Sequence, residues 1–190
     1  MEVKEGDYKI INFKTSESAL DLSGTDGKTI SGWSHTDGDN QKWHITLNST
    51  ADAHHIRNAA SGKYLAFNGE VRDGFGNTLI VVDEPVDWWL VAAEDGAPHD
   101  PNAPIRIMVP RMPFCLDLTD NGDPKPGTRV EVWGKCDLDS QKWLLQHTHV
   151  AETKKVPWYK RGHHHHHRKE SRECSRERSK ERSRERNPRE

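Results

Sequence analysis

Short runs of alternating hydrophobic and polar residues occupy positions 6–149 of the chain. Gly, Asp, Asn and Pro separate these runs at short intervals, as is typical of turns between strands. No run continues with the 3.6-residue period of a long amphipathic helix. The pattern therefore predicts an all-β sandwich or barrel. Representative runs lie at 8–11, 19–22, 29–33 and 42–45.

The chain also resembles itself at intervals of about 45 residues. The motif L-D-L occupies 20–22 and 116–118, and Q-K-W occupies 41–43 and 141–143. A degenerate copy, D-W-W at 87–89, lies between the two Q-K-W motifs. Such periodicity indicates three copies of one supersecondary unit. Four short strands in each copy predict twelve strands in all.

A Q-x-W motif that closes each repeat, with L-D-L earlier in the repeat, resembles the ricin-B type β-trefoil lectins. The similarity is greatest to the single-domain intracellular lectins of mushrooms, and it covers about residues 6–147. It implies a β-trefoil, in which a six-stranded barrel is capped by three hairpins, and a protein that binds carbohydrate without altering it. It also favours terminal galactose or N-acetylgalactosamine, and it places Trp43 and Trp143 in the core.

The first repeat holds the groups that a sugar requires. A carboxylate accepts charge-assisted hydrogen bonds from neighbouring hydroxyls, and an aromatic ring covers the apolar C–H face. The resemblance implies that Asp21 and Asn40 bind sugar hydroxyls while Trp33 stacks on the ring. It further implies that Gln41 holds the Asp21 carboxylate, and that His35 adds a contact. Each residue alone has a structural explanation, but the set at family spacing favours a carbohydrate site.

The third repeat keeps Asp117, Trp133 and Gln141 but has Ser140 where the first repeat has an asparagine. Asp117 and Trp133 are sixteen residues apart instead of twelve, and the extra residues fall in the loop at 121–127. We expect these three residues to form a second, weaker carbohydrate site.

The middle repeat lacks these groups. With Trp89 taken as its closing tryptophan, Ala66 occupies the aspartate position and Asp87 the glutamine position. Val82 lies opposite Trp33 in the alignment. We therefore expect no carbohydrate site in the middle repeat.

The first residues include no apolar leader, and no stretch approaches the ~20 apolar residues of a membrane helix. The chain has three cysteines, too few for a disulfide scaffold. We therefore expect a cytoplasmic protein without membrane insertion. By resemblance, Cys115 and Cys136 match an intra-repeat disulfide of secreted relatives, and in the cytoplasm we expect the pair to be reduced.

Charge divides the chain into two parts. Residues 1–150 hold 14 Lys and Arg against 23 Asp and Glu, a net charge of −9, whereas 151–190 hold 14 against 7, a net charge of +7. An acidic body argues against nucleic acid binding by the folded part. The composition predicts a folded domain at 1–149, which the resemblance identifies as a lectin domain, and a disordered, His-rich and Arg/Ser/Glu-rich tail at 150–190.

The function of this tail has two interpretations. An Arg/Ser segment can contact RNA or direct nuclear entry, but the interleaved glutamates cancel most of its positive field and favour a solvated extension. Its five consecutive histidines, 163–167, have no ordered geometry, so we expect no physiological metal or cofactor.

Other functions make different demands on the sequence. The motifs G-x-S-x-G, H-E-x-x-H and the P-loop are absent from the sequence, so we expect no catalytic residues and no enzyme. A β-trefoil protease inhibitor that acts through exposed loops is the alternative, but it does not require the set that contains Asp21. The expected partners are glycans or glycoconjugates. Homodimer formation stays open, since a single weak sugar site benefits from avidity.

Overall fold

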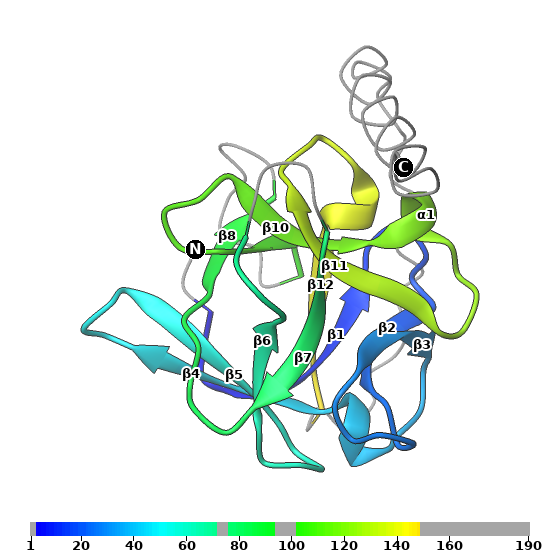
Figure 1. The fold of residues 1–190 in the computed structure, drawn as a ribbon, viewed down its shortest axis with the longest axis horizontal. Helices are drawn as coiled ribbons and strands as arrows, with labels where there is room; N and C mark the ends of the chain where they lie inside the picture. Colours follow the sequence, from blue (N-terminus) through cyan, green and yellow to red (C-terminus); the bar gives the residue numbers. More distant parts are fainter. Residues whose placement is uncertain (1–2, 72–75, 94–101, 149–190) are drawn as a thin grey trace, which may run out of the picture.

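The computed structural model describes residues 3–71, 76–93 and 102–148, so the predicted tail lies outside the described residues. The described part contains twelve strands and three short helical turns, which confirms the predicted strand number (Figure 1). The strands are β1 (Gly6–Asn12), β2 (Ser18–Leu22), β3 (Ile30–Ser34), β4 (Trp43–Asn48), β5 (Ala53–Asn58), β6 (Tyr64–Phe67), β7 (Asn77–Val82), β8 (Trp89–Ala92), β9 (Ile105–Met108), β10 (Phe114–Leu118), β11 (Thr128–Gly134) and β12 (Trp143–His147). The turns are η1 (Asp39–Gln41), α1 (Thr119–Gly122) and η2 (Asp139–Gln141).

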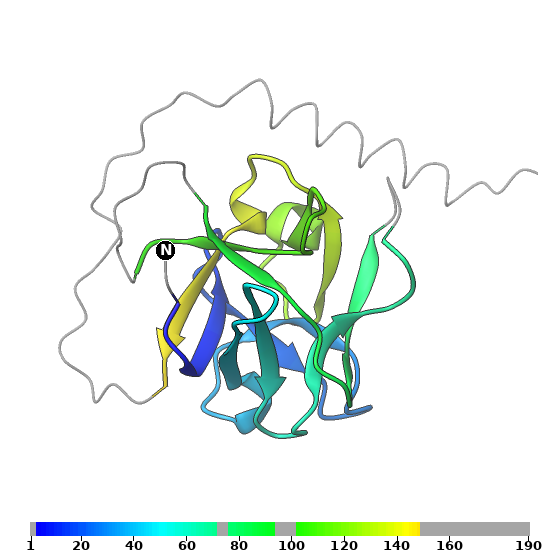
Figure 2. The ribbon, with the colours of Figure 1, turned by 90° about the vertical axis from the view of Figure 1, so that its left-hand side faces the viewer.

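Six strands close into a barrel. Strand β1 pairs with β4 and with β12, β4 pairs with β5, and β9 pairs with both β8 and β12. A bridge between His54 and Trp88 joins β5 to β8 and completes the ring. The first and last strands, β1 and β12, therefore lie side by side (Figure 2). Closure removes the exposed sheet edges that an open β-structure would present.

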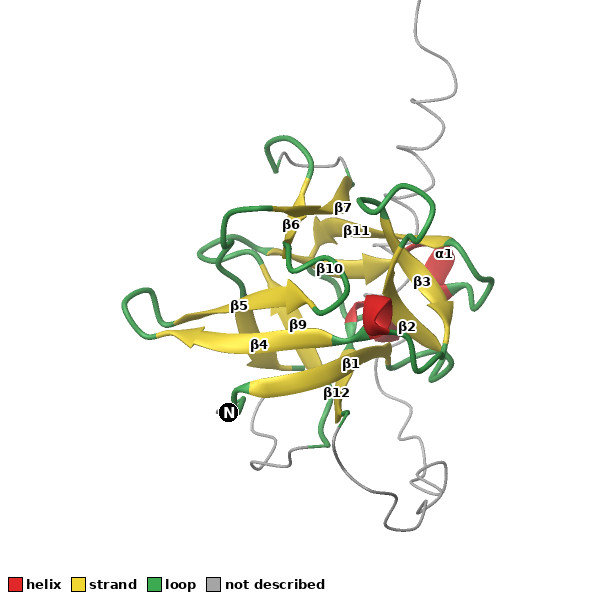
Figure 3. Ribbon diagram, turned by 90° about the horizontal axis from the view of Figure 1, so that it is seen from below, coloured by secondary structure: helices red, strands yellow, loops and turns green. Residues whose placement is uncertain are grey.

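Three hairpins, β2–β3, β6–β7 and β10–β11, cap one end of this barrel (Figure 3). They also pair with one another. Strand β11 pairs with β3 at Thr128 and Gly32 and with β7 at Glu131 and Thr78, and the bridge from Thr29 to Ile80 joins β3 to β7. The barrel and its cap form the predicted β-trefoil with pseudo-threefold symmetry.

Each repeat buries one tryptophan and satisfies its indole N–H in the same way. Trp43, Trp88 and Trp143 are fully buried, which confirms the core assignment of the first and the third. A buried N–H without an acceptor costs about 1–3 kcal/mol, so each indole requires a partner. The acceptors are the carbonyl oxygens of Leu20 for Trp43 at 2.9 Å, of Leu65 for Trp88 at 2.9 Å, and of Leu116 for Trp143 at 3.2 Å.

The alignment of the middle repeat on Trp89 was wrong by one residue. Trp88 makes the equivalent hydrogen bond, whereas Trp89 is only partly buried. The glutamine position therefore falls on Val86, and Asp87 lies one residue beyond it. The D-W-W motif offers two adjacent tryptophans and no glutamine, so the sequence alone did not fix the register.

Within the described residues, no helix is long and apolar enough to cross a bilayer.

Candidate functional site

Asp21, on β2, is bonded to two carboxamides that come from η1. Its Oδ2 accepts hydrogen bonds from Asn40 Nδ2 at 2.9 Å and from Gln41 Nε2 at 2.8 Å. Its second oxygen, Oδ1, accepts none from the described residues. Asp21 is only 6% exposed, so the carboxylate is held rigidly with one oxygen committed to the protein.

Gln41 links Asp21 to the loop that carries Asn40. Its Nε2 also donates to the carbonyl oxygen of Ser34 at 2.9 Å, while its Oε1 accepts the backbone N–H of Thr36 at 2.8 Å. The side chain is fully buried. Because both ends of the carboxamide are bonded, the group cannot flip, and its nitrogen is held toward Asp21 and the Ser34 carbonyl oxygen, which is the geometry expected of a supporting residue.

Asn40 closes the same network from the solvent side. Besides Asp21, its Nδ2 contacts the carbonyl oxygen of Leu22 at 3.2 Å. Its Oδ1 accepts no hydrogen bond from the described residues, and the residue is half-buried. Asn40 Oδ1 and Asp21 Oδ1 are therefore two hydrogen-bond acceptors available to a ligand.

Burial and hydrogen bonding act in opposite directions on the Asp21 carboxyl group. Burial raises its pKa above the ordinary 3.8, and the bonds from Gln41 and Asn40 offset part of this effect. A carboxylate in this state gains from each additional hydroxyl donor that a ligand brings.

Trp33 supplies an exposed aromatic surface on the same hairpin. It lies on β3 and is 44% exposed, an unusual exposure for so large an apolar side chain. A Cβ added to Gly127 would lie 3.6 Å from its ring, and the Gly127 N–H donates to the carbonyl oxygen of Gly32 at 2.9 Å. A turn of the third repeat therefore supports one side of the indole.

His35 is exposed and follows Trp33 by two residues, just after β3. Its imidazole forms no hydrogen bond with the described residues of the predicted site. Desolvation lowers the pKa of His35, and the Lys9 ammonium lowers it further, with partial opposition from Glu17. The structure therefore joins Asp21, Asn40 and Gln41 directly, and it places Trp33 on the same hairpin with His35 at its end.

In the third repeat the Asp–Gln pair is present but its surroundings differ. Asp117 Oδ2 accepts from Gln141 Nε2 at 2.8 Å. Gln141 Oε1 accepts the Cys136 backbone N–H at 2.7 Å and, at 3.3 Å, a guanidinium N–H of Arg106. Asp117 is 1% exposed, and Trp133 is half-buried. The pair here is enclosed by protein groups.

The extra residues of the third repeat contribute to this enclosure. They overlap the end of α1, which packs against β10, β11 and η2. Asp120 and Asn121 adopt left-handed φ values of 54° and 57° there. A Cβ on the following Gly122 would lie 3.3 Å from the Cβ of Ser140, so this turn lies directly over the position equivalent to Asn40. The spacing of the motifs revealed the insertion, but it did not reveal that the inserted segment folds over Ser140.

The middle repeat has neither a carboxylate nor an aromatic ring at the equivalent positions. Ala66 pairs with Ile80 as Asp21 pairs with Ser31, and Val82 pairs with Tyr64. The Ala66 and Val82 assignments follow directly from this register.

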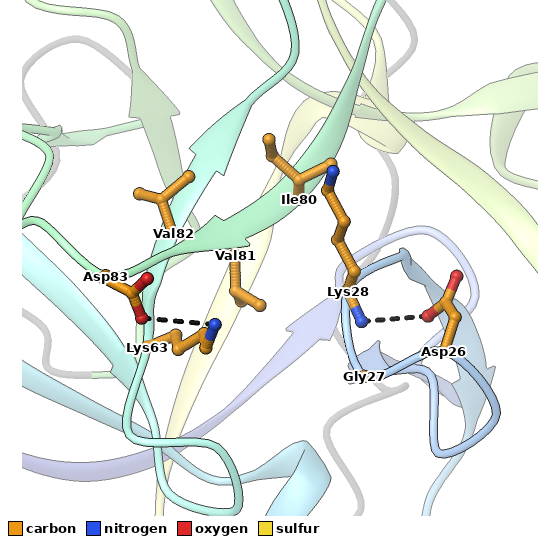
Figure 4. Close-up of a pocket in the computed structure, with 8 residues that line it drawn as sticks. All are labelled: Asp26, Gly27, Lys28, Lys63, Ile80, Val81, Val82 and Asp83. Atoms are coloured by element: carbon orange, nitrogen blue, oxygen red, sulfur yellow. Dashed lines mark hydrogen bonds and ion pairs between the residues drawn. The ribbon is translucent and has the colours of Figure 1, made fainter.

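A cleft lies beside the middle repeat. This cleft has a volume of about 410 Å³ and lies between the β2–β3 turn and hairpin β6–β7 (Figure 4). Its carboxylates already have partners: Asp83 pairs with Lys63 at 3.2 Å, and Asp26 accepts the backbone N–H groups of Lys28 and Thr29 at 2.9 Å. A hydrogen bond from the Thr29 hydroxyl, together with these backbone bonds, holds the pKa of Asp26 well below its usual range. Without an aromatic lining, the cleft is less suited to a sugar than the first repeat.

No group of three or more His, Cys, Asp or Glu suited to a metal occurs in the part of the chain that the structure describes. The histidine run at 163–167 lies outside that part.

A β-trefoil whose β2–β3 hairpin carries a carboxylate and an exposed tryptophan, with a carboxamide of η1 bonded to that carboxylate, points to the lectin class. The family described as ricin-type beta-trefoil lectin domain-like matches residues 1–82 and 39–133. The chain belongs to this family. No match was found among curated protein sequences.

Solved structures support the same assignment. The ricin B-like lectin of Macrolepiota procera, solved in complex with lactose, is 34% identical with a TM-score of 0.68, and the match covers 77% of this chain and 99% of that one. The Rhizoctonia solani agglutinin is 25% identical with a TM-score of 0.64, covering 76% and 96%. The designed threefold-symmetric protein ThreeFoil, at 23% identity, a TM-score of 0.62 and coverages of 74% and 97%, shows similarity of fold alone.

Proposed function

We propose that this protein is a non-catalytic lectin that binds terminal galactose or N-acetylgalactosamine of glycans through its first repeat. The observation that carries the proposal is the arrangement of the first repeat. Hydrogen bonds hold one oxygen of the Asp21 carboxylate and leave the other for a ligand, and the same hairpin exposes the ring of Trp33. Similarity to the Macrolepiota procera lectin, which was solved with lactose, supports it.

The chemistry of these groups matches that of a sugar. Asp21 Oδ1 accepts a hydrogen bond from one hydroxyl, and Asn40 Oδ1 accepts from a neighbouring one. The indole of Trp33 covers the C–H face of the ring. Galactose suits this arrangement because its axial O4 leaves the opposite face of the ring apolar. The site binds and orients the sugar, and the proposal assigns it no bond-breaking step.

The alternative, a β-trefoil protease inhibitor, would act through exposed loops. It would gain nothing from a free Asn40 Oδ1 beside Asp21, or from an exposed indole supported by Gly127. We therefore place the lectin function first.

A glycan array tests the substrate class. The full chain should retain glycans that end in galactose or N-acetylgalactosamine, and it should not retain matched glycans that end in glucose. Titration calorimetry with lactose, with maltose as the control disaccharide, then gives the affinity and the number of sites. Retention of no terminal galactoside, together with inhibition of a protease panel, would replace the lectin with the inhibitor.

A further inference from the structure

The loop that carries Asn40 contains a glycine whose role neither the motif spacing nor the resemblance reveals. Gly38 precedes η1 with φ −66° and ψ 147°, which is an extended conformation open to any residue. Backbone strain therefore does not explain a glycine at this position. The surroundings do, because a Cβ built there would lie 2.5 Å from Asn40 Oδ1 and 3.3 Å from Thr36 Oγ1.

The atom that such a Cβ would strike belongs to the proposed ligand site. Asn40 Nδ2 bonds Asp21 at 2.9 Å and Leu22 at 3.2 Å, so the carboxamide is fixed with its Oδ1 beside Gly38. A real Cβ contact of 2.5 Å does not occur, so the carboxamide would rotate away. Because it is the end of a side chain, the fold would accommodate the change while the Asn40 acceptor was displaced.

The third repeat has changed at both of these positions. Leu138 occupies the position of Gly38 and is 7% exposed, and Ser140 replaces Asn40. The Ser140 hydroxyl is buried and forms no hydrogen bond in the described part of the chain. A large side chain at the first position thus coincides with a shortened one at the second, as expected if the two compete for the same space.

We infer that Gly38 is a positioning residue that makes the first repeat competent to bind sugar, and that the exchange to Leu138 and Ser140 helps to close the third. This inference rests on the proposed function for its consequence in binding. Its structural part, that residue 38 sets the orientation of the Asn40 carboxamide, is independent of any sugar.

The test compares Gly38→Ala with Gly24→Ala in the full chain. Gly24 belongs to the β2–β3 connection, and a Cβ there would meet nothing within 4 Å, so it is a matched control. Calorimetry with lactose should show about tenfold weaker binding for Gly38→Ala, the loss of one hydrogen bond to the ligand, with the cooperative thermal transition retained. Gly38→Leu should weaken binding further, whereas Gly24→Ala should bind as the parent does.

A double-mutant cycle separates positioning from a general loss of structure. In an Asn40→Ser background the displaced group is absent, so Gly38→Ala should cause no further loss of affinity. Additive losses would overturn the inference, and so would lactose binding by Gly38→Ala equal to that of the parent.

NMR of the Asn40 side-chain amide tests, without any sugar, whether residue 38 sets the orientation of this carboxamide. Its signals should move in Gly38→Ala and stay in place in Gly24→Ala. If the parent protein binds no lactose but these signals move, the proposed function fails and the positioning role stands. Unmoved signals would overturn the positioning role whatever the protein binds.

Discussion

Asp21→Asn is the substitution that tests the proposed site most directly. The two N–H donors of Asn40 and Gln41 converge on one oxygen of Asp21, at 2.9 and 2.8 Å. An asparagine at position 21 must direct its carbonyl oxygen toward them, since its NH₂ group would meet two donors. The NH₂ group then occupies the position of Oδ1. The ligand-facing atom changes from a charged acceptor to a neutral donor.

The size of the effect follows from this geometry. A hydrogen bond to a charged group contributes about 1.5–3 kcal/mol, and each 1.4 kcal/mol is a factor of ten in affinity. The loss of one such bond predicts about 10- to 100-fold weaker binding. Stability should change little, because both bonds to position 21 are kept. Burial raises the pKa of Asp21, so the neutral amide also removes a desolvation cost.

The assay is titration calorimetry with lactose, combined with thermal unfolding followed by circular dichroism. Asp26→Asn is the matched control, since Asp26 lies on the β2–β3 connection but its carboxylate bonds only its own turn. This control should lose some stability, because Asp26 holds its own turn, but it should keep its affinity for lactose. Full lactose binding by a folded Asp21→Asn protein would refute the site as described.

Four further predictions follow from the same structure. Trp33→Ala should weaken lactose binding about tenfold or more at little cost in stability, because Trp33 is 44% exposed. Trp43→Ala should instead cost about 3–5 kcal/mol in the free energy of unfolding and unfold the domain, because Trp43 is fully buried. Acidification should weaken lactose binding as Asp21 becomes protonated, and because its pKa is raised the loss should begin above the pH expected from the ordinary value of 3.8. Truncation after residue 149 should leave a cooperative thermal transition, and its disappearance would show that the tail is structural. Asp117→Ala should lower the melting temperature without changing lactose affinity, whereas losses of affinity equal to those of Asp21→Ala would make the two sites equivalent.

The repeats and their core could be predicted because the repeats bury equivalent residues, and the motifs that contain these residues recur along the sequence. The L-D-L and Q-x-W motifs recur together in the first and third repeats, since each buried tryptophan must reach the carbonyl oxygen of the leucine that precedes the aspartate position. The middle repeat kept the tryptophan and lost the glutamine. Without the glutamine, the sequence does not show whether Trp88 or Trp89 is equivalent to Trp43. The indole hydrogen bond of Trp88 identifies it as the equivalent residue.

Details of the site were less accessible to sequence reasoning. The contact between Gly38 and Asn40 depends on a distance within one loop, and no periodicity reports it. Comparison of the two Q-x-W loops was the available signal, since glycine and asparagine in one align with leucine and serine in the other. The segment that covers the third repeat includes left-handed residues in α1. The spacing of the motifs does not determine where such a segment lies.

The retention of Asp117 and Gln141 has an explanation that does not involve sugar. Gln141 bonds Asp117, the carbonyl oxygen of Gly134 and the Cys136 N–H, and so it ties the loop after β11 to β10. Removing either partner would leave buried polar groups unsatisfied, at a cost of about 1–3 kcal/mol. Folding therefore preserves the Asp–Gln pair in a repeat whether or not that repeat binds a ligand. The exposed ring and the free carboxamide oxygen contribute little to folding. Under the proposed function, these two groups, present together in the first repeat, would distinguish a repeat that binds sugar.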